Sequence, residues 1–217
     1  MDRDPAVDRV LALLDTIENE PMPVPIREVW VLGDLALGLD PVERLDIYLS
    51  KDLLFSSHRT DPDTAEKYRD TFGIDGIGTT VSAEWAKRFP DCIRANANGH
   101  AAPERCLGAH LVAETEPIHL EVCNAGFEQN VTQRLRGAKA TESWEELLDP
   151  RAVCLWKDGH RSEEAPDRLR EGGFVFPTLP EAFEMLGLSK GDAEEAATVI
   201  QKWRAHSDGR TVRGEVI

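Results

Sequence analysis

Apolar residues near the start of the chain recur at the spacing of an amphipathic helix. Asp4 can cap this segment, and Pro5 suits its first turn. The apolar positions that follow lie three or four residues apart or side by side: Val7, Val10, Leu11, Leu14 and Ile17. Because Pro21, Pro23 and Pro25 exclude a helix from the next segment, the pattern predicts one helix that packs on a core, followed by an extended linker.

Short apolar runs rich in β-branched residues predict strands at four places: 29–32, 45–49, 118–123 and 152–156. The first run is apolar throughout and ends at Gly33, which is typical of a strand buried on both faces. In the third run apolar and polar residues alternate. One face is predicted to carry Ile118, Leu120 and Val122, and the other His119, Glu121 and Cys123.

Helical patterns occupy much of the remaining chain. We expect helices over 61–73, from Ser82 through Phe89, and over 103–113, 127–136, 142–148, 180–186 and 192–205. The last of these has an apolar stripe formed by Ala193, Ala196, Val199, Ile200 and Trp203. The elements predict an α/β fold with a small mixed sheet of about four strands flanked by helices. We expect one domain over residues 1–165 and a short C-terminal helical segment over 166–217 packed on it.

The order of strands and turns, with Gly33-Asp34, Asp46 and Glu121, resembles the polymerase-β-type nucleotidyltransferase superfamily. In that superfamily a Gly-Ser turn grips nucleotide phosphate, two carboxylates one residue apart hold divalent metal, and a third lies on a neighbouring strand. The segment AVCLWKDGHRSEE also resembles its usual last strand. The resemblance covers roughly residues 27–165. It implies that Gly33, Asp34 and Arg44 lie at a nucleotide, and that Asp46 and Glu121 bind Mg²⁺.

Phosphoryl transfer commonly uses two cations about 3.5 to 4 Å apart, held by hard oxygen ligands. This chain departs from that requirement at two positions. Asp34 stands in place of the phosphate-gripping Ser and would oppose an anion at a cost of about 1 to 4 kcal/mol at 4 Å. Arg44 replaces the first metal carboxylate, so only Asp46 and Glu121 are left and at most one Mg²⁺ is expected.

These departures favour a catalytically degraded domain that binds a nucleotide, an RNA end or a protein partner, and no catalytic residue is assigned. Two alternatives stay open. The first is an active Mg²⁺-dependent nucleotidyltransferase that uses Asp46 and Glu121. The second is a protein-interaction module with no small-molecule site.

The charge of the chain is strongly negative, with 40 Asp and Glu against 25 Lys and Arg and a net charge of −15. The acidic residues are spread along the whole length, which favours a salt-rich cytoplasm, because salt screens their mutual repulsion. The balance argues against extended nucleic-acid binding, although Arg134, Arg136 and Lys139 form one basic island. No signal peptide pattern and no apolar run near about 18 residues is visible, so we expect a cytoplasmic protein without membrane association.

Three stretches make the whole chain similar to an uncharacterised haloarchaeal protein family. They are PMPVPIREVWVLGDLALGLDPVERLDIYLSKDLL, PIHLEVCNAGFEQNVTQRLRGA and FVFPTLPEAFEML. This resemblance implies a halophilic archaeal source and a cytoplasmic location, and it implies no activity.

A rival site would hold zinc. Cys106 and His110 are four residues apart on a predicted helix, and His119 and Cys123 are four apart on a predicted strand. Residues four apart on a strand are separated by roughly 13 Å, too far to chelate one ion together. A smaller site would use Cys106, His110 and one other ligand. We favour a satisfied, partly buried histidine over either metal site.

Overall fold

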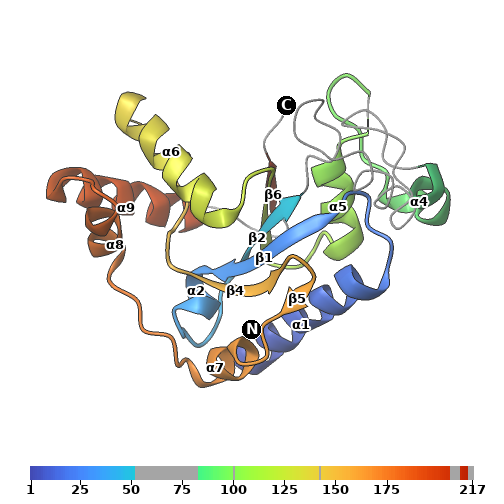
Figure 1. Ribbon diagram of the computed structural model, residues 1–217, viewed down its shortest axis with the longest axis horizontal. Helices are drawn as coiled ribbons and strands as arrows, with labels where there is room; N and C mark the ends of the chain where they lie inside the picture. The colour runs from blue at the N-terminus through green and yellow to red at the C-terminus, as the bar shows by residue number, and fades with distance from the viewer. Residues whose placement is uncertain (52–82, 100, 142, 206–210, 215–217) are drawn as a thin grey trace.

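The computed structural model describes residues 1–51, 83–99, 101–141, 143–205 and 211–214. Its centre is one mixed sheet in the order β5-β4-β1-β2-β3-β6 (Figure 1). The strands are β1 (Ile26–Leu32), β2 (Leu45–Lys51), β3 (Ile118–Cys123), β4 (Ala152–Lys157), β5 (His160–Arg161) and β6 (Thr211–Gly214). β1 is antiparallel to β2 and β4, whereas β3 is parallel to β2 and β6. The predicted mixed sheet is confirmed, with the short edge strands β5 and β6 in addition to the four expected.

The helices surround this sheet. They are α1 (Arg3–Asn19), α2 (Gly33–Ala36), α4 (Ala83–Arg88), α5 (Pro103–Leu111), α6 (Phe127–Thr141), α7 (Ala165–Glu171), α8 (Leu179–Met185) and α9 (Lys190–Ala205), with a 3₁₀ turn over Pro90–Cys92. No helix in the described part of the chain is long and apolar enough to cross a membrane. The helix predicted over 61–73 lies outside the described residues.

Two details of the predicted helices are wrong. α1 begins at Arg3, so Asp4 lies inside its first turn and does not cap it. The described residues of 142–148 form no helix. The side chains of that segment point into two different apolar clusters, Trp144 and Leu147 into one and Leu148 into the other, which suits an irregular backbone.

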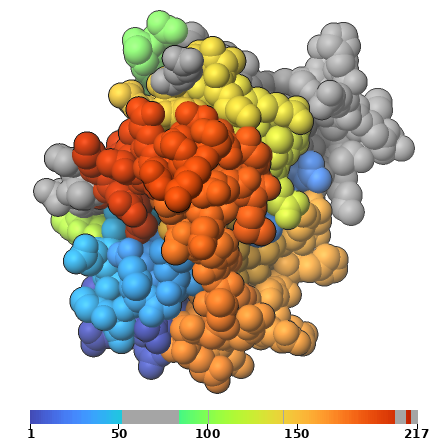
Figure 2. Space-filling model, turned by 90° about the vertical axis from the view of Figure 1, so that its left-hand side faces the viewer, coloured from blue at the N-terminus to red at the C-terminus, as the bar shows by residue number. Residues whose placement is uncertain are grey.

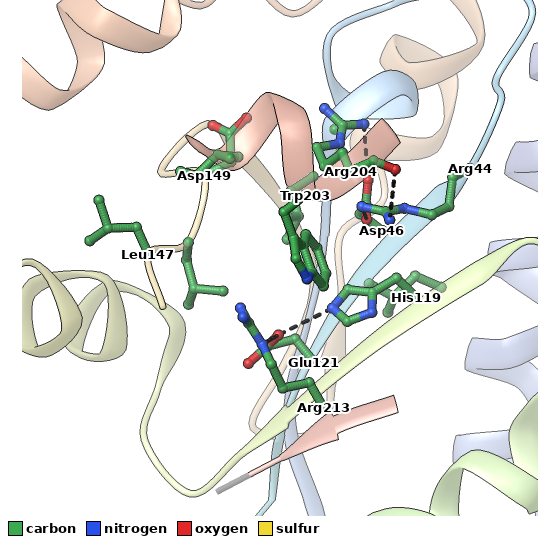
Figure 3. A pocket seen from close by; sticks show the side chains of 14 residues that line it. Arg44, Asp46, His119, Glu121, Leu147, Asp149, Trp203, Arg204 and Arg213 are labelled. Atoms are coloured by element: carbon green, nitrogen blue, oxygen red, sulfur yellow. Dashed lines mark hydrogen bonds and ion pairs between the residues drawn. The ribbon is translucent and has the colours of Figure 1, made fainter. Parts of the chain in front are cut away.

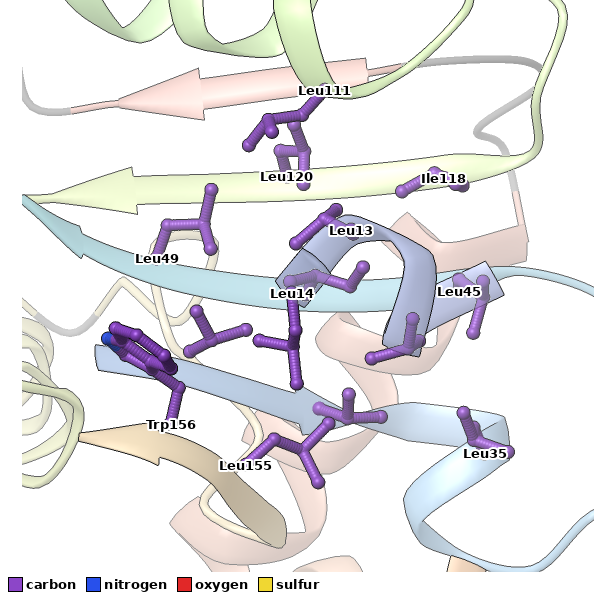
Figure 4. Close-up of a cluster of buried hydrophobic side chains, with 14 of the residues drawn as sticks. Leu13, Leu14, Leu35, Leu45, Leu49, Leu111, Ile118, Leu120, Leu155 and Trp156 are labelled. Atoms are coloured by element: carbon purple, nitrogen blue, oxygen red, sulfur yellow. The ribbon is translucent and has the colours of Figure 1, made fainter. Parts of the chain in front are cut away.

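The main core lies on one face of the sheet. Alternate residues of the central strands, such as Leu45, Leu49 and Leu120, pack there against Leu13 and Leu14 of α1 (Figure 4). Helices α5 and α7 contribute to the same cluster. Each fully buried leucine contributes about 1.5 to 3 kcal/mol of burial free energy, so this face anchors the fold. The predicted packing of α1 on a core is confirmed.

The opposite face of the sheet is covered by α6 and by the end of α9. Tyr48 and Cys123 of the central strands pack on Phe127 and Val131 of α6. α8 and α9 pack on each other and on the end of α6. As a result, β2 and β3 are buried at every position. The division of the chain at residue 165 stays a prediction.

Candidate functional site

Polar side chains of β2 and β3 line a small cavity beneath the last turn of α9 (Figure 3). The sheet contributes Asp46, His119 and Glu121, and α9 contributes Trp203 and Arg204. Other lining residues include Gly33, Arg44, Leu147, Asp149 and Arg213. The cavity volume is about 30 Å³, room for about two water molecules, since one water needs roughly 10 to 15 Å³.

Strand register explains why these polar residues meet. In the parallel pair of β2 and β3, Asp46 lies opposite His119 and Tyr48 lies opposite Glu121. Because side chains alternate between the faces of a strand, Asp46, His119 and Glu121 all leave the sheet on the side away from the main core. The predicted sharing of one face by His119, Glu121 and Cys123 is confirmed. Asp46 and Glu121 therefore lie on adjacent strands, as the nucleotidyltransferase resemblance requires.

Asp46 is held by two arginines. Its Oδ1 lies 2.6 Å from Nη2 of Arg44, and its Oδ2 lies 3.0 Å from Nη2 of Arg204. The carboxylate side chain is only 2% exposed. Burial raises the pKa of Asp46, and the charges of Arg204 and Arg44 offset part of this effect. The two guanidiniums thus compensate a carboxylate that would be costly to bury alone.

Glu121 is held by a second pair of arginines. Arg134 Nη2 lies 2.5 Å from Oε1, and Arg213 Nε donates to Oε2 at 2.6 Å. His119 Nε2 lies 3.1 Å from the same Oε2. Burial would raise the pKa of Glu121, but the hydrogen bond from His119 and the charges of Arg213 and Arg134 together lower it to about 2. Glu121 is therefore a buried carboxylate that is ionised at neutral pH.

The hydrogen bonds of His119 fix its tautomer. An ionised Glu121 can only accept, so Nε2 of His119 carries a proton. In the neutral imidazole Nδ1 then accepts a hydrogen bond from the hydroxyl of Thr211, 2.7 Å away. His119 thereby links β3 to β6.

The turn at Gly33 and Asp34, which follows β1, lies beside Asp46 and Arg204. Gly33 has φ +67°, and a Cβ there would clash with Oδ2 of Asp46 and would lie 2.5 Å from Nη2 of Arg204. Only glycine fits so close to these two groups. The Asp34 carboxylate accepts the backbone N–H of Glu43 and of Arg44 and contacts Nη2 of Arg204 at 2.7 Å. Asp34 therefore holds the chain at the start of β2, a role that the sequence does not indicate.

Trp203 fills the centre of the site. The guanidinium carbons of Arg44 and Arg213 each lie over its indole at 5.0 Å from the ring centroid, within cation–π range. The ring of His119 meets it edge-on at 4.8 Å. Figure 3 shows the indole lying between these groups.

The structure brings together all five residues that the sequence places at the site, namely Gly33, Asp34, Arg44, Asp46 and Glu121. It adds four that sequence reasoning missed: Arg134, Trp203, Arg204 and Arg213. Arg134 had a signal, since it belongs to the basic island. The sequence signal at Trp203 was misleading, since Trp203 continues the apolar stripe of α9 and that pattern is typical of a core residue.

The donor set does not fit a divalent cation in this arrangement. Within the described ranges no three His, Cys, Asp or Glu residues are placed to hold a metal ion. Asp46 and Glu121 each face two guanidiniums, which a cation would have to displace. Nε of Arg44 and Nε of Arg204 are buried and find no hydrogen-bond acceptor among the residues that the structure describes. Oδ2 of Asp46 is also buried without a hydrogen-bond donor among these residues, although it lies 3.0 Å from Nη2 of Arg204. Because guanidiniums already neutralise the carboxylates, the unsatisfied N–H donors favour an anionic ligand over a metal ion.

Cys106 and His110 lie elsewhere, on α5. The Cys106 thiol accepts the backbone N–H of Arg94 and donates to its carbonyl oxygen. His110 lies 3.1 Å from a carboxylate oxygen of Glu20 and packs edge-on against Phe89. Burial lowers the pKa of His110. The predicted partial burial of His110 is confirmed, but its Nε2 makes no hydrogen bond to the residues that the structure describes, so the prediction that it is satisfied is not borne out.

Comparison with known proteins gives one match. The model of a family of unknown function, DUF7095, matches residues 2–217. No curated protein and no solved structure matches the chain. The resemblance to an uncharacterised family is confirmed to that extent, and the haloarchaeal source stays an expectation. The chain belongs to DUF7095, a family of unknown function.

Proposed function

We propose that this chain is a non-catalytic binding protein with a nucleotidyltransferase-like core, in which arginines bind the phosphates of a nucleotide. The observation that carries the proposal is the pairing of both candidate metal carboxylates, Asp46 and Glu121, with two guanidiniums each. Three of these four arginines are called the arginine cluster below. They are Arg44, which directly precedes β2, Arg134 of α6 and Arg213 of β6.

A guanidinium can do part of what a bound metal does. It neutralises a carboxylate and donates hydrogen bonds to phosphate in a planar fork, and it stays charged at all ordinary pH values. It does not act as a Lewis acid that makes a hydroxyl or water nucleophilic. The arginine cluster therefore supports recognition of a phosphate without supporting its transfer.

The relative exposure of the arginines and the carboxylates in the site also favours an anionic ligand. The carboxylates of Asp46 and Glu121 are 2% exposed, whereas the arginine side chains are 7% exposed at Arg44, 12% at Arg134 and 23% at Arg213. An entering ligand therefore meets guanidinium groups before it meets the carboxylates beneath them. A negative ligand gains from this order, because each charge-assisted hydrogen bond is worth about 1.5 to 3 kcal/mol.

The decisive experiment is calorimetric titration with ATP, GTP, CTP, UTP and inorganic pyrophosphate, with Mg²⁺ or with EDTA. Multi-molar KCl is chosen because of the acidic composition. We expect binding that persists in EDTA and weakens at least about tenfold in Arg213→Gln. The matched control is Arg170→Gln, which removes an arginine that pairs with Asp8 at the surface, away from the cavity.

Each alternative predicts a different result. An active nucleotidyltransferase would require Mg²⁺ and would release a labelled product that Asp46→Asn abolishes. An interaction module would give no heat with any of these ligands, in the wild type or in a variant with an opened cavity such as Trp203→Ala. Either result, from protein shown to be folded by circular dichroism, would overturn the proposal.

A further inference from the structure

The indole of Trp203 occupies a place built for a flat, electron-rich ring. Two guanidiniums lie over it and one imidazole touches it from the edge. Arginines stack on aromatic faces whether the ring belongs to a protein or to a ligand. Indole is a fused five- and six-membered ring, as is a purine. The same cage of Arg44, Arg213 and His119 would therefore accept a purine base.

The face and the edge of a guanidinium can serve different groups. While the face of Arg44 covers the ring, its buried Nε has no acceptor among the described residues. A phosphate attached to a stacked base could accept from such an edge. The geometry thus provides for both the aromatic and the anionic part of one ligand.

The last turn of α9 is held over the cavity by the polar contacts of Arg204 and by the ring contacts of Trp203 with Arg44, Arg213 and His119. Arg204 pairs with Asp34 at 2.7 Å and with Asp46 at 3.0 Å, and Nη1 of Arg44 donates to the carbonyl oxygen of Arg204. The apolar anchor of the helix lies earlier, where Ala193, Ala196, Ala197 and Ile200 pack on α6 and α8. Figure 2 shows these red and orange helices lying directly against the light blue surface of the early chain. Because helix ends open most easily, the last turn can leave without unpacking that anchor.

We infer that Trp203 is a built-in occupant of the ligand site, and that the last turn of α9 is a latch that a purine nucleotide must displace. The inference rests on the proposed function and adds the class of ligand and the regulation of its access. The cavity of about 30 Å³ is far too small for a nucleotide, so a ligand at this site requires the indole to leave. Binding and the closed latch therefore exclude each other.

A latch of this kind lowers the apparent affinity by the fraction of open protein. Minor states populated at about 0.1 to 10% reduce affinity about 10- to 1000-fold. Removing the indole should raise the apparent affinity by the same factor. We expect Trp203→Ala to bind ATP and GTP at least about tenfold more tightly than the wild type. The gain should be smaller for inorganic pyrophosphate, which has no ring to stack between the arginines.

The test is titration of the wild type, Trp203→Ala and Trp144→Ala with ATP and pyrophosphate in EDTA. Trp144 is the matched control, since its indole packs in the cluster of α6, α8 and α9 and does not line the cavity. We expect no gain in affinity from Trp144→Ala. Should Trp203→Ala fail to fold, Arg204→Gln provides the second test, because it removes the ion pairs to Asp34 and Asp46 and keeps the indole.

Three outcomes are distinct. Tighter ATP binding by the opened variant supports the latch. If the wild type and Trp203→Ala bind ATP with equal affinity, the latch is overturned and the proposed function stands. Where Trp203→Ala does not fold, the same comparison is made between the wild type and Arg204→Gln. No binding of ATP or pyrophosphate by any of these folded proteins overturns the proposed function itself.

Discussion

The charge on Glu121 should account for a measurable part of the stability of this protein. Glu121→Gln keeps the size of the side chain and removes its charge. The lowering of the Glu121 pKa from 4.5 to about 2 corresponds to about 3 kcal/mol, at about 1.4 kcal/mol for each pH unit. Because this side chain is 2% exposed, solvent screening takes little from that value.

The sign of the pH dependence follows from the lowered pKa. Below about pH 2 the carboxyl is protonated in the folded and the unfolded chain, and its charge contributes nothing. Between about pH 2 and the unfolded value of 4.5 the unfolded chain binds more protons, so the free energy of unfolding rises with pH. Above that range the full contribution is present. The amide variant lacks this rise and also leaves Arg134 and Arg213 without their shared carboxylate.

Urea unfolding at constant KCl concentration, from about pH 3.5 to pH 7, measures the effect. The difference in unfolding free energy between wild type and Glu121→Gln should grow with pH to about 3 kcal/mol and then stay level. Glu163→Gln, at an exposed position, serves as the control and should show no such growth. A difference that stays constant across this range would refute the conclusion that the ionised Glu121 is stabilised by its ion pairs.

Two further predictions concern backbone conformation and helix capping. Gly33→Ala should lower the free energy of unfolding by about 2 to 4 kcal/mol, because it adds a clash with Asp46 to a φ of +67°. Gly159→Ala is the control, because Gly159 also has a positive φ of +87° but an added Cβ would meet no atom within 4 Å. Calorimetry should therefore show a smaller loss of stability in Gly159→Ala than in Gly33→Ala. Equal losses would contradict the predicted clash. Thr178→Ala should cost about 1 kcal/mol, since Thr178 caps α8 with Glu181 in a capping box. Thr178→Ser should keep most of that stability, and denaturant unfolding of the two variants decides.

Alternation along single strands made part of the site predictable. Glu121 could be placed on one face with His119 and Cys123 because side chains alternate with a period of two, whereas its position on a strand next to that of Asp46 was implied by the resemblance. The strand assignments behind this needed only local patterns of four to six residues. Gly33 was equally visible, because a glycine that ends an apolar run marks a turn.

Long-range partners were not predictable in the same way. Arg213 reaches Glu121 across 92 positions and Arg204 reaches Asp34 across 170, and no local pattern encodes such a pairing. β5 has two residues and β6 has four, too few for a periodic signal. Trp203 continues the apolar stripe of α9, yet it lies past the anchor of that helix and over the cavity. Ala193, Ala196 and Ile200 of the stripe are buried, whereas Trp203 is half-buried, so the stripe could not tell a core from a site.

The position of Arg44 connects the resemblance to the proposed function. Arg44 precedes Asp46 by two residues, the spacing at which the nucleotidyltransferase superfamily has its first metal carboxylate. A carboxylate there would bring a mobile cation to the phosphate, whereas an arginine supplies a cation that is tethered to the strand. Under the proposed function, affinity for phosphate does not depend on Mg²⁺, and without the metal there is no Lewis acid to activate a nucleophile. On this proposal, an arginine at this position makes a phosphate-binding site without metal, while β2, its register with β3 and the buried Asp46 keep the arrangement that the structure shows.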